Sequence, residues 1–441
     1  MDPLSHAAYD LLANLAGPPL VLAASARGRF GGRWRERLGL TFFPHRVYGR
    51  PRLWFHGASA GEIQAAAAVI AAVLAERPAA DIYLSAGTPA GLARAADFRA
   101  GEPRVRVMAV PLDFWGAAGR MAARLKPEAL IILETELWPN LIRAARAQGA
   151  KLILASARLS ERSFQRYRLI RPFMSALLAG FDLIAAAGPR EMELFAALGA
   201  PEERLTVLGN PKFDRLLNQA GQPDSRDRAA ELQARLWGAA VPGPLVVAGS
   251  THPGEEDILA EAAEKLWPGR PELRLVLAPR HVGRVRDVAA RLRKRGLTVA
   301  LSEEAGPLFP GARVVLVETL GQLTSFYALA TVAVVGGSLR PGLDGHNPLE
   351  PAALARPVLF GPHMASFAAE AEGLTRAGGA KTSRPETLAD DLAAWLNAPD
   401  EARAAGQAAR EFLAARPPSA PSLAASILGF FPEQGASSCP G

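Results

Sequence analysis

The chain has 441 residues, of which 49% are hydrophobic and 21% are charged, a composition typical of globular proteins and not of disordered ones. Its length exceeds one typical domain and suits two domains of roughly 200 residues each. The formal net charge of +7 favours anionic partners such as nucleotides, phosphorylated substrates, phospholipid surfaces or nucleic acid, without choosing among them.

The single cysteine, Cys439, excludes an intramolecular disulfide and a cysteine-based metal cluster. The seven histidines are scattered, with no HExxH or comparable pair. The sequence therefore predicts no metal site and no cofactor, and it fits a reducing compartment.

Residues 7–26 are largely apolar and approach the length of about 20 residues that spans a membrane. Asp10 and Asn14 interrupt this stretch, and Pro18 and Pro19 are expected to break its helix. Basic residues follow it directly: Arg27, Arg29, Arg33, Arg35 and Arg37. A secretory signal carries its positive charge before the apolar run, so we expect residues 1–40 to form a membrane-associated segment held by anionic headgroups. The alternative is an ordinary buried helix of the first domain.

From residue 52 onward, short apolar runs alternate with amphipathic stretches such as 63–76 and 140–148, a pattern that indicates parallel βαβ units. The strands expected before residue 215 are 52–59, 81–87, 105–112, 129–136, 151–157, 181–188 and 205–210. Those expected after residue 243 are 245–251, 273–280, 297–302, 314–318, 332–337 and 357–362.

Residues 215–243 contain no strand-like run and predict a linker with one helix, whereas the tail from 385 to 431 has a helical pattern. We therefore expect two consecutive doubly wound α/β, Rossmann-like domains, 41–222 and 223–431. Ligands of such sheets bind at the carboxyl ends of the strands, and two such domains facing each other make a cleft.

Three loops of the first domain carry candidate catalytic groups. Glu62 ends the motif HGASAGE and suits a general base, although a carboxylate in the first turn of a helix is also favoured by the helix dipole alone. Glu134 and Glu136 of ETELWPN alternate after an apolar strand, and we expect a role in the cleft for Glu134. Lys212 of GNPKFD could face a carboxylate or phosphate, or be a solvated surface lysine.

The second domain offers groups that suit a nucleotide. Arg280 of the motif APRH presents a bidentate fork to phosphate, and STHPGEE at 250–256 could form an anion-binding turn. In GHNPLEPA, Asn347 could cap a helix that Pro348 begins, and Glu350 could bind both ribose hydroxyls. The fingerprints of nicotinamide enzymes and of P-loop NTPases are absent from the sequence.

Eight motifs in this order resemble those of the 3-deoxy-D-manno-oct-2-ulosonic acid (Kdo) transferases of lipopolysaccharide synthesis. They are HGASAGE, ETELWPN, ASARLS, GNPKFD, STHPGEE, APRH, GGS and GHNPLEPAA. The resemblance implies a GT-B architecture with an N-terminal acceptor domain and a C-terminal donor domain. It also implies transfer of Kdo from CMP-Kdo, with inversion, to the tetraacylated lipid A precursor at the cytoplasmic face of the inner membrane.

The resemblance also assigns roles to residues of this chain. It makes Glu62 the general base, and Glu134 and Lys212 its electrostatic helpers. The expected contacts to CMP are Pro279, Arg280, Leu320, Gly321, Gln322, Asn347, Pro348, Leu349 and Glu350. No metal is implied.

Three other classes of protein share parts of this pattern. A nucleotide-sugar epimerase can share the two-domain plan but would not need the apolar, basic N-terminus. A nucleic-acid binder is disfavoured because no basic cluster is interleaved with aromatic residues, which make up only 7% of the chain. A membrane-bound nucleotide-sugar sensor would keep the donor loops but would not need Glu62.

Overall fold

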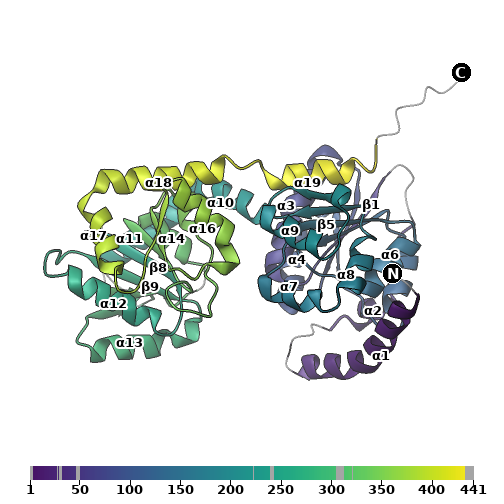
Figure 1. Ribbon diagram of the computed structural model, residues 1–441, viewed down its shortest axis with the longest axis horizontal. Coiled ribbons are helices and arrows are strands. Elements are labelled where there is room, and N and C mark those ends of the chain that lie inside the picture. The colour runs from purple at the N-terminus through teal and green to yellow at the C-terminus, as the bar shows by residue number, and fades with distance from the viewer. Residues whose placement is uncertain are drawn as a thin grey trace, which may run out of the picture. The chain divides into compact units, whose positions relative to one another are not determined.

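The computed structural model describes residues 3–26, 28, 32–45, 50–221, 223–238, 243–303, 312–319 and 321–432. Two compact units divide the chain: the first is Met1–Asp214 together with Pro417–Gly441, and the second is Arg215–Arg416. Each unit contains one seven-stranded sheet in which all neighbouring strands are parallel (Figure 1). The fold class expected from the sequence, two doubly wound α/β units, is confirmed.

The sheet of the first unit has the strand order β3-β2-β1-β4-β5-β6-β7. Its strands are β1 (Arg52–Gly57), β2 (Asp81–Ala86), β3 (Val105–Ala109), β4 (Ala129–Leu133), β5 (Lys151–Ala157), β6 (Leu183–Ala186) and β7 (Leu205–Val207). The chain winds outward in one direction from β1 to β3 and then in the other from β4, so the topological switch point lies between β1 and β4. Ligand sites of such sheets lie at the carboxyl ends of the strands flanking this point.

Helices cover both faces of this sheet. Leu53 and Phe55 of β1 join one core cluster, whereas Trp54 between them joins the cluster on the opposite face. Both faces are buried because parallel sheets place their connecting helices on either side. The helices of this unit are α1 (Pro3–Ala26), α2 (Trp34–Arg37), α3 (Ala60–Glu76), α4 (Pro89–Gly101), α5 (Ala117–Leu125), α6 (Pro139–Ala147), α7 (Glu161–Arg168), α8 (Arg171–Leu178), α9 (Pro189–Ala197) and α19 (Ser419–Leu428).

The sheet of the second unit has the strand order β10-β11-β9-β8-β12-β13-β14, with its switch point between β8 and β12. Its strands are β8 (Leu245–Thr251), β9 (Arg274–Pro279), β10 (Val299–Leu301), β11 (Val314–Leu316), β12 (Val332–Val335), β13 (Val358–Phe360) and β14 (Ala380–Thr382). The last of these was not expected from the sequence. It is a three-residue edge strand without an apolar run, and two of its three residues are exposed.

The helices that accompany this second sheet again lie in the connections between strands. They are α11 (Pro223–Trp237), α12 (Glu255–Leu266), α13 (Val285–Lys294), α14 (Leu323–Leu329), α15 (Leu349–Ala353), α16 (Ala368–Arg376), α17 (Leu388–Asn397) and α18 (Pro399–Ala414). A further helix, α10 (Pro211–Gly221), carries the chain from the first unit into the second. Residues 215–243 thus contain the end of α10 and the whole of α11, where the sequence predicted one helix.

The boundaries of the compact units differ from the expected domain limits of 41–222 and 223–431. The first unit consists of two segments, one that ends at Asp214 and one that begins at Pro417. The second segment belongs to it because α19 packs against α3. Leu423 and Ile427 of α19 are fully buried in a core cluster of the first sheet. The backbone N–H of Ala420 also donates to the Asp214 carboxylate at 2.7 Å. A helical pattern shows that a helix forms but not which sheet it packs on.

The N-terminal helix α1 runs unbroken from Pro3 to Ala26, so the expectation that Pro18 and Pro19 break it was wrong. The helix is held on both sides of the prolines, since Ala13 and Val21 pack against the cluster formed by Leu112, Phe114 and Ala117. This tertiary packing offsets the cost of about 3 kcal/mol for a proline inside a helix.

Candidate functional site

Strained backbone marks the carboxyl ends of three strands. Glu134 directly after β4, Ser156 near the end of β5 and Ser250 near the end of β8 adopt left-handed φ angles of 57°, 51° and 56°. Such a conformation is unfavourable for residues other than glycine and persists where surrounding structure imposes it, often at functional sites. Two of these positions, Glu134 after β4 and Ser250 in β8, lie beside the switch points of the two sheets.

In the first unit, Glu62 stands in the first turn of α3, as expected. Its Oε2 accepts the backbone N–H groups of Ala58 at 2.5 Å and Ser59 at 3.3 Å, and its Oε1 accepts the Ser59 hydroxyl at 2.9 Å. With the Ser59 hydroxyl accepting from the Glu62 N–H, these contacts complete a capping box. Among the described residues, Oε1 meets only the Ser59 hydroxyl, which can rotate away, so Oε1 is the carboxylate oxygen that a ligand could reach.

Lys212 and Glu134 form an ion pair at the same edge of the sheet. The Asn210 side chain accepts the backbone N–H of Lys212 at 3.0 Å and fixes the start of α10. A Cβ at Gly61 would lie 3.4 Å from the lysine Nζ, so the absence of a side chain there makes room for Lys212. Glu62, Glu134 and Lys212, separated by up to 150 positions in sequence, thus come together as the sequence predicted.

Glu136 joins this group, although sequence reasoning assigned it no role. The predicted strand alternation of Glu134 and Glu136 was wrong, because β4 ends at Leu133 and the chain turns at Glu134. Even so, burial and the negative charges of Glu62 and Glu134 raise the pKa of Glu136, which accepts the Trp138 indole N–H at 2.8 Å. Its place in the ETELWPN motif was the signal that could have found it.

In the second unit, the buried carboxylate of Glu255 gathers backbone groups from both sides of the switch point. It accepts the N–H of His252, at 2.9 Å, from the loop after β8. It also accepts three consecutive N–H groups, of Gly337 at 2.7 Å, Ser338 at 3.0 Å and Leu339 at 2.9 Å, from the loop after β12. Glu255 is fully buried and locks the two loops together. Within the motif STHPGEE, no local signal predicted this role for Glu255.

The expected nucleotide contacts lie around this frame. Pro279 is buried at the end of β9, and the N–H of Arg280 donates to the Thr251 carbonyl at 2.9 Å. Pro348 and Leu349 are buried at the start of α15. The ends of β8 and β9 and the start of α15 thus lie in one unit.

Glu350, which we expected to bind the ribose hydroxyls, contacts Asn347, which we expected to cap a helix. The Asn347 side chain caps α15 by accepting the Leu349 N–H at 3.0 Å, and its amide donates to Glu350 at 3.4 Å. Burial raises the pKa of Glu350, whereas Asn347 and the positive charge of Arg280 oppose this shift.

The remaining expected contacts stand at the start of α14. Gly321 has a φ of 89°, and the Gln322 amide donates to Glu303 at 2.8 Å, while its buried Oε1 has no partner among the described residues. Leu320 lies outside the described residues.

In the ranges that the structure describes, no group of three or more His, Cys, Asp or Glu side chains could hold a metal ion.

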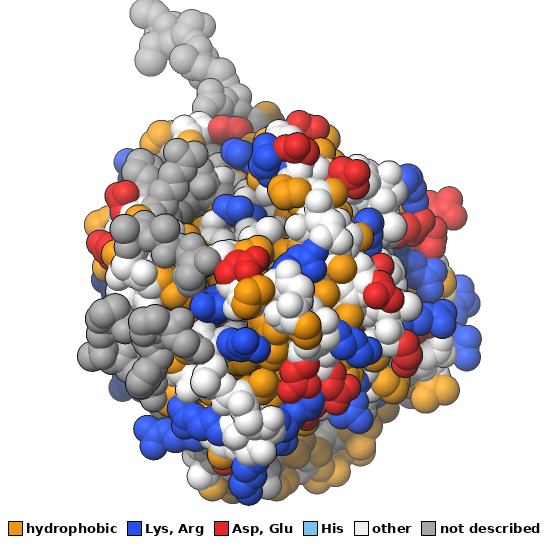
Figure 2. Space-filling view, turned by 90° about the vertical axis from the view of Figure 1, so that its left-hand side faces the viewer, with side chains coloured by type: hydrophobic (Ala, Val, Ile, Leu, Met, Phe, Trp, Pro, Cys, Tyr) orange, Lys and Arg blue, Asp and Glu red, His pale blue; other side chains and the backbone are white. Residues whose placement is uncertain are grey.

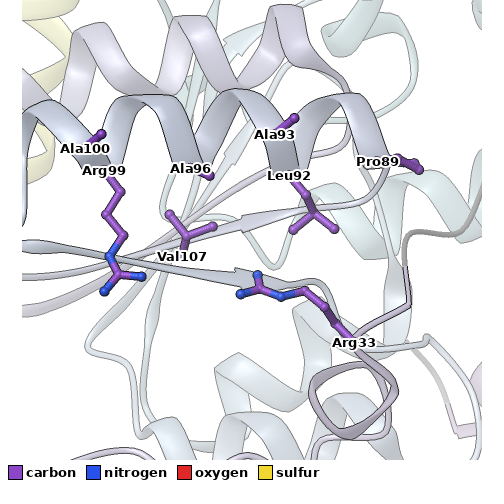
Figure 3. A pocket seen from close by; sticks show the side chains of 8 residues that line it. All are labelled: Arg33, Pro89, Leu92, Ala93, Ala96, Arg99, Ala100 and Val107. Atoms are coloured by element: carbon purple, nitrogen blue, oxygen red, sulfur yellow. The ribbon is translucent and has the colours of Figure 1, made fainter.

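A separate groove of about 590 Å³ lies at the edge of the first sheet (Figure 3). The helix α4 lines it with Leu92 and alanines, and Val107 of β3 lies between the guanidinium groups of Arg33 and Arg99 (Figure 3). None of the expected site residues lines this groove.

The surface shown in Figure 2 mixes Lys and Arg with Asp and Glu side chains, and no large area of a single sign stands out on this face. Some of the second unit's basic residues are also engaged by acidic neighbours: Arg295, for example, approaches Asp257, Glu261 and Glu264 within 4 Å. The excess of positive charge is therefore not gathered on this face.

Two parallel sheets with polar clusters at their switch points define a GT-B glycosyltransferase fold. A glycosyltransferase from Rickettsia africae matches 87% of this chain and 98% of its own at a TM-score of 0.59 and 12% sequence identity. The UDP-GlcNAc 2-epimerase of Neisseria meningitidis matches 86% of this chain and 98% of its own, also at 0.59, with 13% identity. The fold alone thus fits the epimerase alternative as well as a transferase.

Sequence similarity separates these two classes. Residues 32–215 match the family model described as 3-deoxy-D-manno-octulosonic-acid transferase. The 3-deoxy-D-manno-octulosonic acid transferases of Bordetella pertussis and Haemophilus influenzae are 34% and 32% identical to this chain, over 91% and 87% of its length and 90% and 88% of theirs. The chain belongs to the Kdo transferase family and is a glycosyltransferase, as the motifs indicated.

Proposed function

We propose that this protein transfers Kdo from CMP-Kdo to the tetraacylated lipid A precursor, with inversion at the anomeric carbon. The observation that carries the proposal is the group of Glu62, Glu134 and Lys212 at the switch point of the first sheet, in a chain of the Kdo transferase family. We assign the acceptor to the first unit and the donor to the second.

In this proposal the Oε1 atom of Glu62 replaces its contact with the Ser59 hydroxyl by a contact with the acceptor hydroxyl and removes its proton. The deprotonated oxygen attacks the anomeric carbon from the face opposite the phosphate, and CMP leaves with the electron pair of the broken bond. Direct displacement of this kind inverts the anomeric centre. Lys212 stabilises negative charge near the reacting centre, and Glu134 holds its ammonium group in place.

The donor contacts proposed in the second unit are Pro279, Arg280, Leu320, Gly321, Gln322, Asn347, Pro348, Leu349 and Glu350. The support for this set is that the described members cluster at the carboxyl ends of the strands and at the starts of α14 and α15. Arg280 offers two parallel N–H groups to phosphate, and Glu350 suits the hydroxyls of a ribose.

The experiment is transfer in vitro with CMP-Kdo and the tetraacyl lipid A precursor, with the products read by mass. We expect Glu62→Gln to lower the transfer rate by roughly 100- to 10,000-fold, because a glutamine keeps the helix cap but cannot accept a proton. Glu76→Gln, at the exposed end of the same helix, is the matched control and should leave transfer unchanged. Full transfer by Glu62→Gln would remove Glu62 as the base, and no transfer by the unaltered protein would refute the acceptor or the donor.

We also propose that α1 attaches the protein to the anionic cytoplasmic face of the inner membrane by lying along it. By length and composition, Ala7–Ala26 could cross a membrane. However, one side of α1 docks on the first unit through polar contacts. Tyr9 donates to Asp113 at 2.7 Å, the Asn14 side chain accepts the Trp115 N–H at 2.8 Å, and Asp10 pairs with Arg143 at 3.3 Å.

The other side of α1 exposes leucines: Leu11 is 62% exposed, Leu15 68% and Leu22 70%. A helix that crossed the bilayer in this docked arrangement would carry the polar side of the first unit into hydrocarbon, which is costly. A helix lying in the interface buries only its leucines there. Fewer of the arginines that follow α1 can contact anionic headgroups than the sequence indicated. Arg37 is buried and donates to the carbonyls of Gly32 and Gly87.

Vesicle flotation tests this attachment. Replacing Leu11, Leu15 and Leu22 together by serine should weaken binding to vesicles containing phosphatidylglycerol by roughly 100-fold, because each leucine loses part of its transfer free energy. Leu169→Ser is the matched control, since Leu169 is 84% exposed on the same unit but lies outside α1. Unchanged binding by the triple variant would contradict the proposal.

A further inference from the structure

Three histidines gather at the switch point of the second sheet. His252 follows β8, His281 follows β9 and His346 lies between β12 and α15. The Nε2 atoms of His252 and His346 are 2.8 Å apart, and the planes of their rings make an angle of 12° with centroids 5.1 Å apart. His281 approaches the His252 ring edge-on at 5.9 Å. None of the three was expected to act in the site.

The fold holds this histidine pair in place. The backbone N–H of His252 donates to the buried Glu255 carboxylate, which also binds the loop that starts at Gly337. A Cβ at Gly337 would lie 2.7 Å from the His346 ring, so only a residue without a side chain admits the imidazole there. The Glu255 carboxylate therefore joins the two loops that hold the rings in contact.

A short contact between two Nε2 atoms constrains the protons of the pair. One ring must donate an N–H and the other must accept it. In the neutral pair one Nδ1 atom carries a hydrogen and the other is bare. One additional proton makes both Nδ1 atoms donors, and in the part of the chain that the structure describes neither Nδ1 has a hydrogen-bond partner.

The surroundings keep the pair neutral when no ligand is bound. Burial, followed by the charges of His252, Arg280 and His281, lowers the pKa of His346 to about 4 against the opposing effect of Glu255. Burial, His281 and Arg284 lower the pKa of His252, and Glu255 and Glu256 oppose them. A phosphate placed beside the pair would add negative charge and favour the protonated form.

We propose that the His252–His346 pair takes up one proton from solvent when the donor phosphate binds and then, as a cation, stabilises the charge that develops on the departing CMP. The proposal rests on the CMP-Kdo donor assigned above. When the bond between the anomeric carbon and the phosphate oxygen breaks, its electron pair goes to the phosphate. The cationic pair meets that charge with an Nδ1–H hydrogen bond, without transferring its proton. The proton returns to solvent when CMP leaves.

The test is calorimetric titration of the full-length protein with the methyl ester of CMP, in two buffers of different ionisation enthalpy. This ligand is a phosphodiester like the donor, and it lacks the monoester phosphate whose second pKa of about 6 would obscure the result. Between pH 7 and pH 5 we expect an uptake of up to about one proton on binding, which increases as the pH falls, and the affinity should rise by up to about tenfold when the pH is lowered by one unit.

His346→Gln and His252→Gln should each bind the ester with no proton uptake, because a glutamine cannot complete the shared site. His45→Gln is the matched control: His45 is exposed in the first unit, and its replacement should leave the uptake unchanged. Binding by the unaltered protein without proton uptake would overturn the proposal, whatever the variants do. Failure of the unaltered protein to bind the ester at all would refute the donor assignment and this inference with it.

Discussion

The switch points of the two sheets share one topology and differ in chemistry. At the first, between β1 and β4, the side chains are mainly acidic and hold one another or their own helix, as in the Lys212–Glu134 ion pair and the Glu62 cap. At the second, between β8 and β12, one buried carboxylate binds four backbone N–H groups. In our proposal the imidazoles and Arg280 meet the donor phosphate there. The first arrangement suits removal of a proton from a hydroxyl, and the second suits an anion.

The largest effect is expected at Glu255, which holds the loops of the second switch point together. We expect Glu255→Gln to lower the free energy of unfolding of the second unit by about 3 kcal/mol, because a single amide oxygen leaves buried N–H groups without acceptors. Glu261→Gln, on the exposed side of the same helix, should change it by less than about 0.5 kcal/mol. Urea unfolding measures both. Equal stability of the two variants would show that Glu255 does not organise the site.

The ion pair of the first site should matter for rate more than for donor binding. We expect Lys212→Met to lower turnover about 100-fold, because it removes the cation beside the reacting centre, and to leave CMP affinity unchanged. Lys151→Met is the control, since Lys151 also pairs with a carboxylate, that of Asp182, at 3.3 Å. Kinetics with CMP-Kdo and calorimetry with CMP separate the two effects. A loss of CMP affinity in Lys212→Met would contradict the division between the units.

The histidines at the two switch points should respond differently to pH. His56 at the end of β1 is fully buried, and burial lowers its pKa to about 4. Between pH 6.5 and 4 the unfolded chain therefore binds a proton that the folded chain does not, so acidification should destabilise the fold by up to about 1.4 kcal/mol per pH unit. Asp113 acts in the opposite direction, because its pKa is raised to about 6 and the folded state favours its protonated form.

Unfolding by urea at several pH values from 7 to 4 measures this dependence. His56→Gln should flatten the loss of stability relative to the unaltered protein, and His45→Gln should not. An unchanged slope in His56→Gln would show that another group controls acid stability. Unlike the His252–His346 pair, His56 should show no dependence on a nucleotide.

The sequence predicted the features that are local in the chain. Apolar runs bounded by small residues located thirteen of the fourteen strands, and the loops that follow them contain Glu62, Glu134 and Arg280. Features that depend on packing were missed. Glu255 looks like an ordinary acidic residue at a helix start, and only the fold shows that three of its four N–H partners lie more than 80 positions away. The contact of His252 with His346 spans 94 positions and leaves no local pattern.

The return of α19 to the first unit has a consequence for synthesis on the ribosome. Ala420, Leu423, Ala424, Ile427 and Leu428 fill part of the core beside α3. These residues are translated after the whole second unit, so the first unit, although made first, completes its core last. The second unit is a closed insertion that can finish folding while its host still exposes apolar surface on α3. A nascent chain whose residues up to 416 have left the ribosome would therefore hold a finished second unit and an unfinished first one.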